Sequence, residues 1–144
     1  MWQWIVRLYH RLGSPKWFYE LTSKWIFWLG LLSVVGGVVG LVLGLLYAPA
    51  DYLQGNSFRI IYIHVPAALV AQSGFVMMAL AGAVFLIWKM KMAAWVARAV
   101  APVGASFCLI ALFTGAIWGK PTWGTWWVWD ARLTSMLMLL FLYF

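Results

Sequence analysis

The sequence predicts an all-α, polytopic membrane protein with three full spans and the start of a fourth. Hydrophobic residues make up 66% of the 144 residues and charged residues only 9%, and the mean hydropathy is +0.92. This composition is typical of integral membrane proteins and excludes a water-soluble globular domain. Three long apolar runs supply the full spans, and a tryptophan-rich interfacial segment follows the third. We expect residues 1–144 to form a single membrane domain.

The first predicted span covers residues 25–47. At about 1.5 Å per residue, a helix of this length crosses a hydrocarbon core of about 30 Å. A small-residue cleavage site after a short apolar core is not visible, so the segment is expected to be an uncleaved anchor. Gly36, Gly40 and Gly44 repeat every four residues, which favours close packing against a neighbouring helix or a partner subunit.

The second and third predicted spans cover residues 64–88 and 100–118, and turn-forming residues precede the second. Pro66 suits the first turn of a helix, which would put His64 at the helix entrance. A fourth apolar segment, MLMLLFLYF, has too few residues to cross the bilayer. We therefore expect the chain to be the amino-terminal part of a longer protein.

Lysines and arginines predict the orientation. Seven lie before the first span or between the second and third: Arg7, Arg11, Lys16, Lys24, Lys89, Lys91 and Arg98. The other two loops carry only Arg59, Lys120 and Arg132. The positive-inside rule then puts the amino terminus in the cytoplasm, with His64 and the tryptophan segment outside. The same distribution favours the lipid bilayer, and not nucleic acid, as the partner of a chain with net charge +7.

Five tryptophans crowd the outer loop after the third span: Trp118, Trp123, Trp126, Trp127 and Trp129. Tryptophan favours the boundary between membrane and water, but this density also favours a flat aromatic surface for a large planar ligand. In a short interfacial helix, Trp123, Trp126, Trp127 and Asp130 would share one face, and Trp129 would point elsewhere. An aromatic belt that only contacts lipid is the alternative.

Three interpretations of His64 are possible: it is a metal ligand, a proton-relay group, or a polar residue whose hydrogen bonds are satisfied at the membrane interface. Beside a tryptophan surface it could be the axial ligand of haem iron. The single cysteine, Cys108, lies in an apolar run without a CxxCH motif, so covalent attachment of haem is not expected.

Two interpretations are also possible for the charged residues of the outer loops. Arg59, Lys120 and Arg132 could receive haem propionates or contact lipid phosphates. Asp130 is expected to orient an arginine or to cap a turn. The sequence contains no visible machinery for hydrolysis or group transfer, so we do not expect an enzyme.

The segments IIYIHVPAA, APADYLQGNSFR and GKPTWGTWWVWDARLTS resemble the CcmC-type haem exporter proteins of cytochrome c maturation, within the tryptophan-rich WWD haem-handling group. The resemblance covers essentially the whole chain. It implies a six-span inner-membrane protein that holds haem b transiently and non-covalently at the periplasmic face, between the WWD segment and two outer histidines. His64 matches the first of these histidines, and the WWD motif matches Trp123, Trp126, Trp127, Trp129 and Asp130.

The resemblance also implies partners. Such proteins present haem to a membrane-anchored haem chaperone and work with ABC-type transporter subunits and a small membrane subunit. Two alternatives stay open: a haem lyase of the same WWD group, which would couple haem to an apocytochrome, and a structural membrane subunit without a ligand.

Overall fold

The computed structural model describes residues 2–144, apart from the side chains of residues 2, 8, 9 and 12. Its elements are helical: α1 (Trp2–Leu12), α2 (Pro15–Val42), the π-helical turn η1 (Leu43–Tyr47), the 3-10 helix η2 (Asn56–Ile60), α3 (Ile61–Trp88), α4 (Lys91–Trp123) and α5 (Ala131–Leu142). Within the described residues, strand-like pairing is limited to an isolated bridge between Asp51 and Gly55. The all-α prediction is therefore confirmed.

Three helical segments are long and apolar enough to cross a membrane: Pro15–Tyr47, Asn56–Trp88 and Lys91–Trp123. The prediction of three full spans is confirmed, but each helical segment, with η1 or η2 included where present, has 33 residues and is longer than predicted. Hydropathy marks where a helix leaves the hydrocarbon, whereas the helix itself continues through the polar interface. Lysines near the ends, such as Lys16 and Lys120, are therefore helical although they lie outside the apolar runs.

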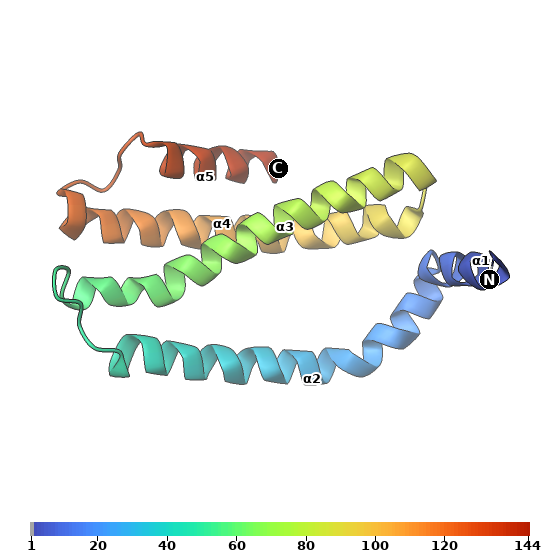
Figure 1. Ribbon diagram of the computed structural model, residues 1–144, viewed down its shortest axis with the longest axis horizontal. Helices are drawn as coiled ribbons and strands as arrows, with labels where there is room; N and C mark the ends of the chain where they lie inside the picture. The colour runs from blue at the N-terminus through green and yellow to red at the C-terminus, as the bar shows by residue number, and fades with distance from the viewer. Residues whose placement is uncertain (1) are drawn as a thin grey trace.

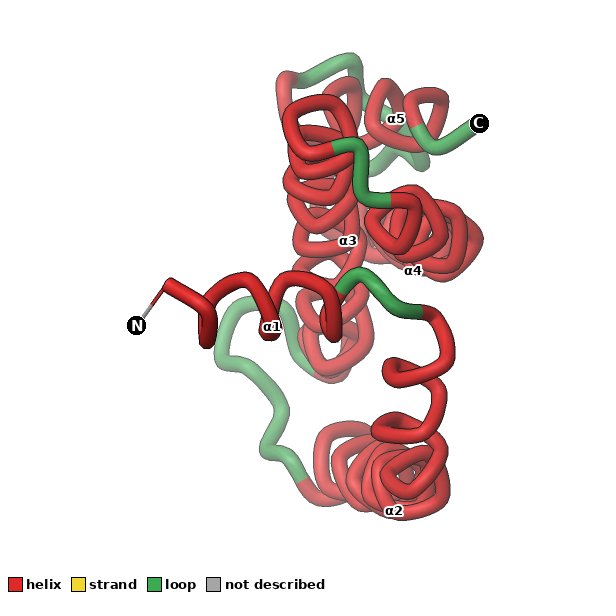
Figure 2. Tube along the Cα trace, turned by 90° about the vertical axis from the view of Figure 1, so that its right-hand side faces the viewer, coloured by secondary structure: helices red, strands yellow, loops and turns green. Residues whose placement is uncertain are grey.

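The spans run up and down, so that the loops at residues 48–55 and 124–130 lie at the same end of the molecule (Figure 1). Lys89, in the left-handed conformation with φ 55°, ends α3 and turns the chain directly into α4. Helices α3 and α4 then lie side by side, and α5 returns beside them (Figure 1). Seen along the molecule, α2 stands apart from this group (Figure 2).

Small residues allow α3 and α4 to approach closely. Ala67 and Ala71 of α3 and Ala105 and Ala111 of α4 are buried. In a membrane, small residues at such positions bring two helix backbones into van der Waals contact. The hydrophobic core of the described chain lies here, where Cys108 is fully buried.

Helix α2 has no such interface. None of its residues, all of which the structure describes, is buried. A side chain added at Gly36 or Gly40 would meet no neighbour within 4 Å. At Gly44 an added Cβ would lie 2.6 Å from Cγ of Tyr62. Within the described residues, the packing predicted for the glycine repeat is therefore found only at Gly44.

The position predicted for Pro66 is wrong. Helix α3 begins at Ile61, directly after η2, so Pro66 lies in the second turn and His64 one turn inside the helix. The reason is the turn at Gly55, whose positive φ of 57° lets the chain begin η2 before the apolar run starts. His64 consequently faces α4 instead of standing at the helix entrance.

Tyr143 fastens α5 to the other two helices. Its hydroxyl donates a hydrogen bond to the Ala71 carbonyl oxygen of α3. Its ring packs edge-to-face against Phe75, with centroids 6.0 Å apart, and covers Gly104 of α4. The carboxyl-terminal end of α5 is thereby held against the α3–α4 pair.

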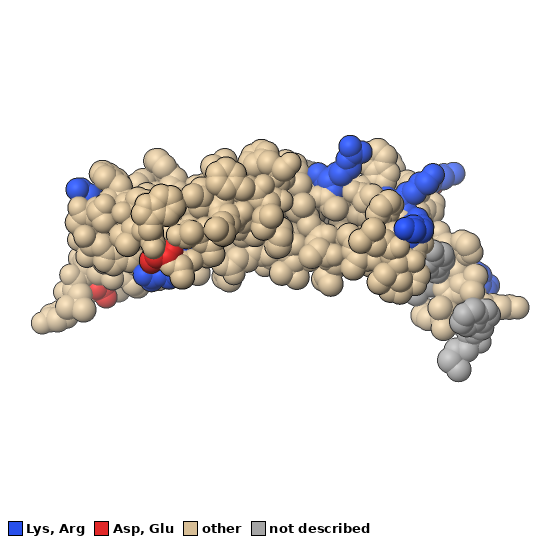
Figure 3. Space-filling view, turned by 90° about the horizontal axis from the view of Figure 1, so that it is seen from above, with Lys and Arg blue, Asp and Glu red and all other residues tan. Residues whose placement is uncertain are grey.

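Charged side chains are unevenly distributed along the molecule. On the face seen in Figure 3, lysines and arginines gather at the end that carries α1 and the turn between α3 and α4. Residues Lys89 and Lys91 belong to that turn. Asp51 and Asp130 lie in the loops at the opposite end.

We expect Gly104→Ala to loosen α5, because the added Cβ would overlap the Tyr143 ring. Overpacking of this kind lowers the free energy of unfolding by about 1–3 kcal/mol. Gly82→Ala on α3 is the matched control, since nothing lies within 4 Å of its added Cβ. Thermal unfolding in detergent would measure both. Equal Tm values for the two variants would contradict this account of Tyr143.

Candidate functional site

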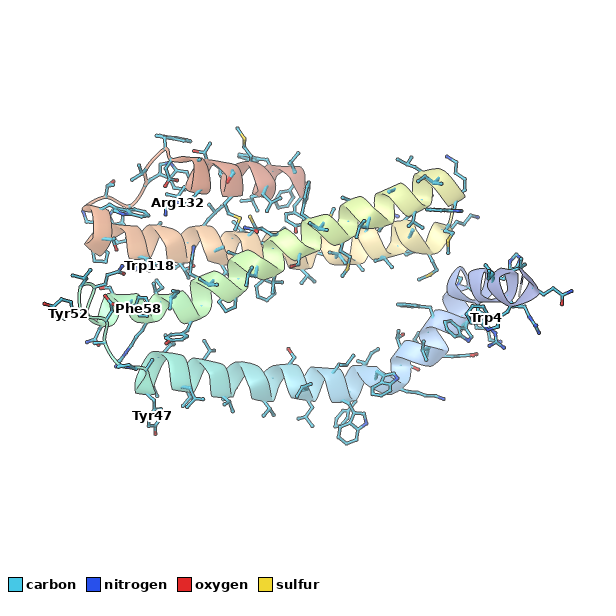
Figure 4. The ribbon with its side chains drawn as sticks, in the orientation of Figure 1. Trp4, Tyr47, Tyr52, Phe58, Trp118 and Arg132 are labelled. Carbon is cyan, nitrogen blue, oxygen red and sulfur yellow. The ribbon has the colours of Figure 1, made fainter. Side chains whose placement is uncertain are left out.

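A cavity of about 320 Å³ opens at the end where the loops gather. It brings together five residues that the sequence singled out: His64, Trp118, Trp123, Asp130 and Arg132. These residues come from α3, from the end of α4, and from the start of α5. Figure 4 shows Trp118 and Arg132 at this same end of the molecule, on α4 and α5. The topology thus assembles most of the predicted site.

His64 is half-buried between α3 and α4. Its Nδ1 lies 3.0 Å from the hydroxyl oxygen of Thr114. Its ring meets the Trp118 ring edge-to-face, with centroids 5.8 Å apart and planes at 69°. An added Cβ at Gly115 would lie 3.1 Å from His64 Cε1, so the glycine gives the imidazole its room. The ring is therefore held in one place by α4.

Trp118 connects the site to the loop after the first span. Its Nε1 donates a hydrogen bond of 2.7 Å to Oε1 of Gln54. Gln54 is oriented by Asp51, whose Oδ1 accepts hydrogen bonds from the Leu53 and Gln54 amides at 2.9 and 2.8 Å. Gln54 was not among the residues predicted from the sequence, because a single glutamine in a polar loop carries no spacing that separates it from its neighbours.

The short interfacial helix expected in the tryptophan segment does not form. Helix α4 continues through Trp123 and ends at Gly124, which adopts the left-handed conformation with φ 76°. Residues 124–130 are not helical. Glycine is favoured at this helix-ending position, where a side chain would be strained. Trp123 therefore belongs to α4, and Trp126, Trp127 and Asp130 do not share a helical face with it.

The last three tryptophans lie outside the cavity lining. Trp126 is 56% and Trp129 75% exposed. Trp127 is turned inward, and its Nε1 is buried without a hydrogen-bond partner among the described residues. Its ring packs edge-to-face on Trp129, with centroids 5.4 Å apart. Lys120 donates a 3.0 Å hydrogen bond to the Gly124 carbonyl and lies 5.9 Å from the centre of the Trp126 ring.

Asp130 performs both of the roles expected of it. Its Oδ1 accepts a 2.8 Å hydrogen bond from the Leu133 amide and so caps α5. Its Oδ2 accepts hydrogen bonds from Arg132 Nε and Nη2 at 3.0 and 2.9 Å. The hydrogen bond from the Leu133 amide, followed by the contacts with Arg132, lowers the pKa of the Asp130 carboxyl group.

Arg132 is fixed on one side and open on the other. Besides its ion pair with Asp130, the guanidinium lies over the Trp123 ring, 5.4 Å from its centre. Its side chain is nevertheless 78% exposed. A guanidinium held in this way can still bind an anionic group from the open side.

Arg59 does not line the His64 cavity. Its Nε and Nη1 donate hydrogen bonds of 3.0 and 3.1 Å to the carbonyl oxygens of Ala48 and Leu45. These carbonyls belong to the end of the first span, where the last carbonyls of a helix have no partner within the helix. In this structure Arg59 joins the first span to the second.

The sequence is similar to proteins of one family. The family model described as "Heme exporter protein C" matches residues 8–144. Heme exporter protein C of Escherichia coli (strain K12) is 55% identical over 134 residues, which are 93% of this chain and 55% of that protein. The protein of the same name from Haemophilus influenzae is 49% identical over 143 residues, 99% of this chain and 56% of the relative. A third, from Bradyrhizobium diazoefficiens, is 42% identical over 132 residues, which are 92% of this chain and 50% of that protein. The chain thus spans about half the length of the curated relatives that it matches.

The lowered pKa of Asp130 predicts a dependence of stability on pH. The folded carboxyl titrates below the usual value of 3.8, so its stabilising effect is complete above about pH 4 and disappears as the pH falls through the folded pKa. Asp130→Asn removes the charge but can still cap α5. At neutral pH we expect this variant to have a lower Tm than the parent chain, and the difference should shrink below about pH 4. A difference that stays constant from pH 3 to pH 7 would rule out this role of the charge.

Proposed function

The chain belongs to the heme exporter protein C family, and on this basis we propose that it is a haem-handling subunit of cytochrome c maturation that holds haem b in the His64 cavity. The observation that carries the proposal is the convergence of one imidazole, two indoles and one open guanidinium on a single cavity. An imidazole can serve as the axial ligand of iron, because the porphyrin supplies the other nitrogen ligands.

The residues of the cavity fit a large, flat, amphipathic ligand. Trp118 and Trp123 offer apolar aromatic walls for a macrocycle. The volume of about 320 Å³ is at the lower end of the range of about 300–1,000 Å³ for small-molecule pockets. A second cavity of about 420 Å³ shares His64, Arg132 and Leu133 with the first. Haem would therefore be only partly enclosed, which suits transient, non-covalent binding before a handover.

Arg132 is the residue that we propose for a haem propionate. A planar guanidinium matches the geometry of a carboxylate, and Trp123 and Asp130 hold this one in position at the cavity. The other two candidate cations have local partners: Arg59 binds the carbonyls that end the first span, and Lys120 binds Gly124. We therefore assign them supporting roles.

The exposed tryptophans are proposed to act at the handover. Trp126 and Trp129 project from the loop before α5, where they would cover the outer edge of the haem together with Trp127. Exposed aromatic side chains are frequent in protein interfaces. We propose that they meet a membrane-anchored haem chaperone, and that the chain works with ABC-type transporter subunits and a small membrane subunit.

The proposed location is the bacterial inner membrane, with the amino terminus in the cytoplasm. The support is the excess of lysine and arginine near α1 and the α3–α4 turn (Figure 3), since cytoplasmic loops are enriched in these residues. In this orientation the His64 cavity and the tryptophan loop open to the periplasm.

The names of the relatives bear on the two alternatives. They describe exporters, which favours handling of haem over the catalysed attachment expected of a lyase. A structural subunit without ligand would show no haem spectrum and would tolerate the loss of His64. The first experiment therefore concerns the spectrum.

The purified chain with added haem is expected to show a Soret band that fades or shifts in His64→Ala. Haem affinity should fall at least about tenfold, equivalent to about 1.4 kcal/mol, because the axial ligand is lost. His10→Ala is the matched control, since His10 belongs to α1 at the other end of the molecule. Spectroscopic titration in detergent measures the affinity. A parent chain that binds no haem would mean either that this half-length chain does not bind haem by itself or that its tryptophans serve lipid, as in the structural subunit. Adding the carboxy-terminal spans of a relative would separate the two.

Two pairs of tryptophan variants separate binding from handover. The double variant Trp118→Leu/Trp123→Leu lacks the aromatic walls of the cavity and should bind haem at least about tenfold more weakly. Trp126→Leu with Trp129→Leu alters only exposed side chains and should have a smaller effect on affinity, but should slow transfer of haem to the apo-chaperone. Stopped-flow absorbance would follow the transfer. Similar losses of affinity in both pairs would contradict the proposed division of roles.

A further inference from the structure

Thr114 is a polar residue buried within the third span, on the side of α4 that faces His64. It is 8% exposed, and its hydroxyl oxygen lies 3.0 Å from His64 Nδ1. A buried hydroxyl within the hydrocarbon needs hydrogen-bond partners, because no water is available to it. The partners of the Thr114 hydroxyl decide which of the two residues donates in the contact with His64.

The single proton of the Thr114 hydroxyl can be located from distances. The hydroxyl oxygen lies 2.7 Å from the carbonyl oxygen of Ile110 and 3.2 Å from that of Ala111. Two oxygens 2.7 Å apart must have a proton between them, since two lone pairs at that distance repel. A carbonyl oxygen carries no proton, so the hydroxyl donates to Ile110. It has no second proton to donate to His64.

The contact with His64 must then run in the other direction. The hydroxyl oxygen accepts a hydrogen bond from Nδ1–H, which fixes the neutral imidazole as the Nδ1–H tautomer. The lone pair of the ring is consequently on Nε2. Trp118 and Gly115 limit the movement of the same ring from the side of α4. Both the tautomer and the ring position are set before any ligand arrives.

We propose that Thr114 is a positioning residue that prepares His64 Nε2 as the iron-binding nitrogen. This inference rests on the proposed function, in which His64 is the axial ligand of haem. Histidines that bind metals commonly donate the other ring N–H to an acceptor, which fixes the tautomer and makes the ligating nitrogen more basic. Here the acceptor is a hydroxyl on the neighbouring span, which is itself held by the α4 backbone.

The test compares Thr114→Val, which keeps the shape of the side chain but removes the hydroxyl, with Thr114→Ser, which keeps the hydroxyl. Loss of an outer-shell partner typically lowers metal affinity by about 10–100-fold, and we expect a loss in this range for Thr114→Val. The midpoint reduction potential of bound haem should become more positive, because a less basic imidazole stabilises Fe(III) less. Thr114→Ser should restore both quantities toward the parent values.

The matched control is Thr22→Val on α2. The Thr22 hydroxyl donates a 2.8 Å hydrogen bond to the Phe18 carbonyl four residues earlier, as that of Thr114 does to Ile110, but Thr22 does not line the His64 cavity. This variant should keep the parent affinity and potential. In a His64→Ala background, Thr114→Val should have no further effect on affinity, since the two residues act as one unit.

The outcomes separate this inference from the proposed function. If His64→Ala binds haem as the parent does, the axial ligand is misassigned and both proposals fail. If His64→Ala loses haem while Thr114→Val keeps the parent affinity and potential, only the role of Thr114 is overturned. A Thr114→Ser variant as weak as Thr114→Val would attribute the loss to packing and would also overturn it. The potential is measured on bound haem alone, so variant chains that bind no haem do not contribute to it.

Discussion

The close packing of α3 against α4 is the interaction on which the rest of the structure depends. Alanines at the contact let the two backbones approach, and only at such a distance can Nδ1 of His64 reach the hydroxyl of Thr114 on the next span. The same contact provides the surface on which Tyr143 fixes α5. At the start of α5, Leu133 is buried and lies beside Gly115 of α4, and this contact keeps the neighbouring Asp130 and Arg132 at the cavity.

The sequence predicted those parts of the fold that follow from the separation of apolar segments in the bilayer from polar segments in water. Apolar runs identified the three spans, and the spacing of those runs brought His64 and the tryptophan segment to one end. The helix ends were predicted less well, since they depend on local turns. Gly55 begins η2 before the apolar run, and Gly124 ends α4 inside the tryptophan segment. Periodicity alone could not reveal either turn.

Residue type was enough to predict most residues of the candidate site, but the structure was needed to show which of them lie at the cavity. His64, Trp118, Trp123, Asp130 and Arg132 meet as expected. Arg59 instead binds the carbonyls that end the first span, a need that arises only once the helix end is known. Gln54 and Thr114 are ordinary polar residues in the sequence. Their partners at the cavity lie 64 and 50 residues away, and such long-range pairs have no local signature.

The hydrogen bond between Gln54 and Trp118 ties the tip of the loop after the first span to the end of α4. A single hydrogen bond of this kind contributes about 0.5–1.5 kcal/mol net, which is comparable to thermal energy. The base of the loop is held separately, by the two hydrogen bonds from Arg59 to the Ala48 and Leu45 carbonyl oxygens. The contact between Gln54 and Trp118 can therefore break and re-form by thermal motion, and loop motions of this kind occur on the nanosecond-to-microsecond scale.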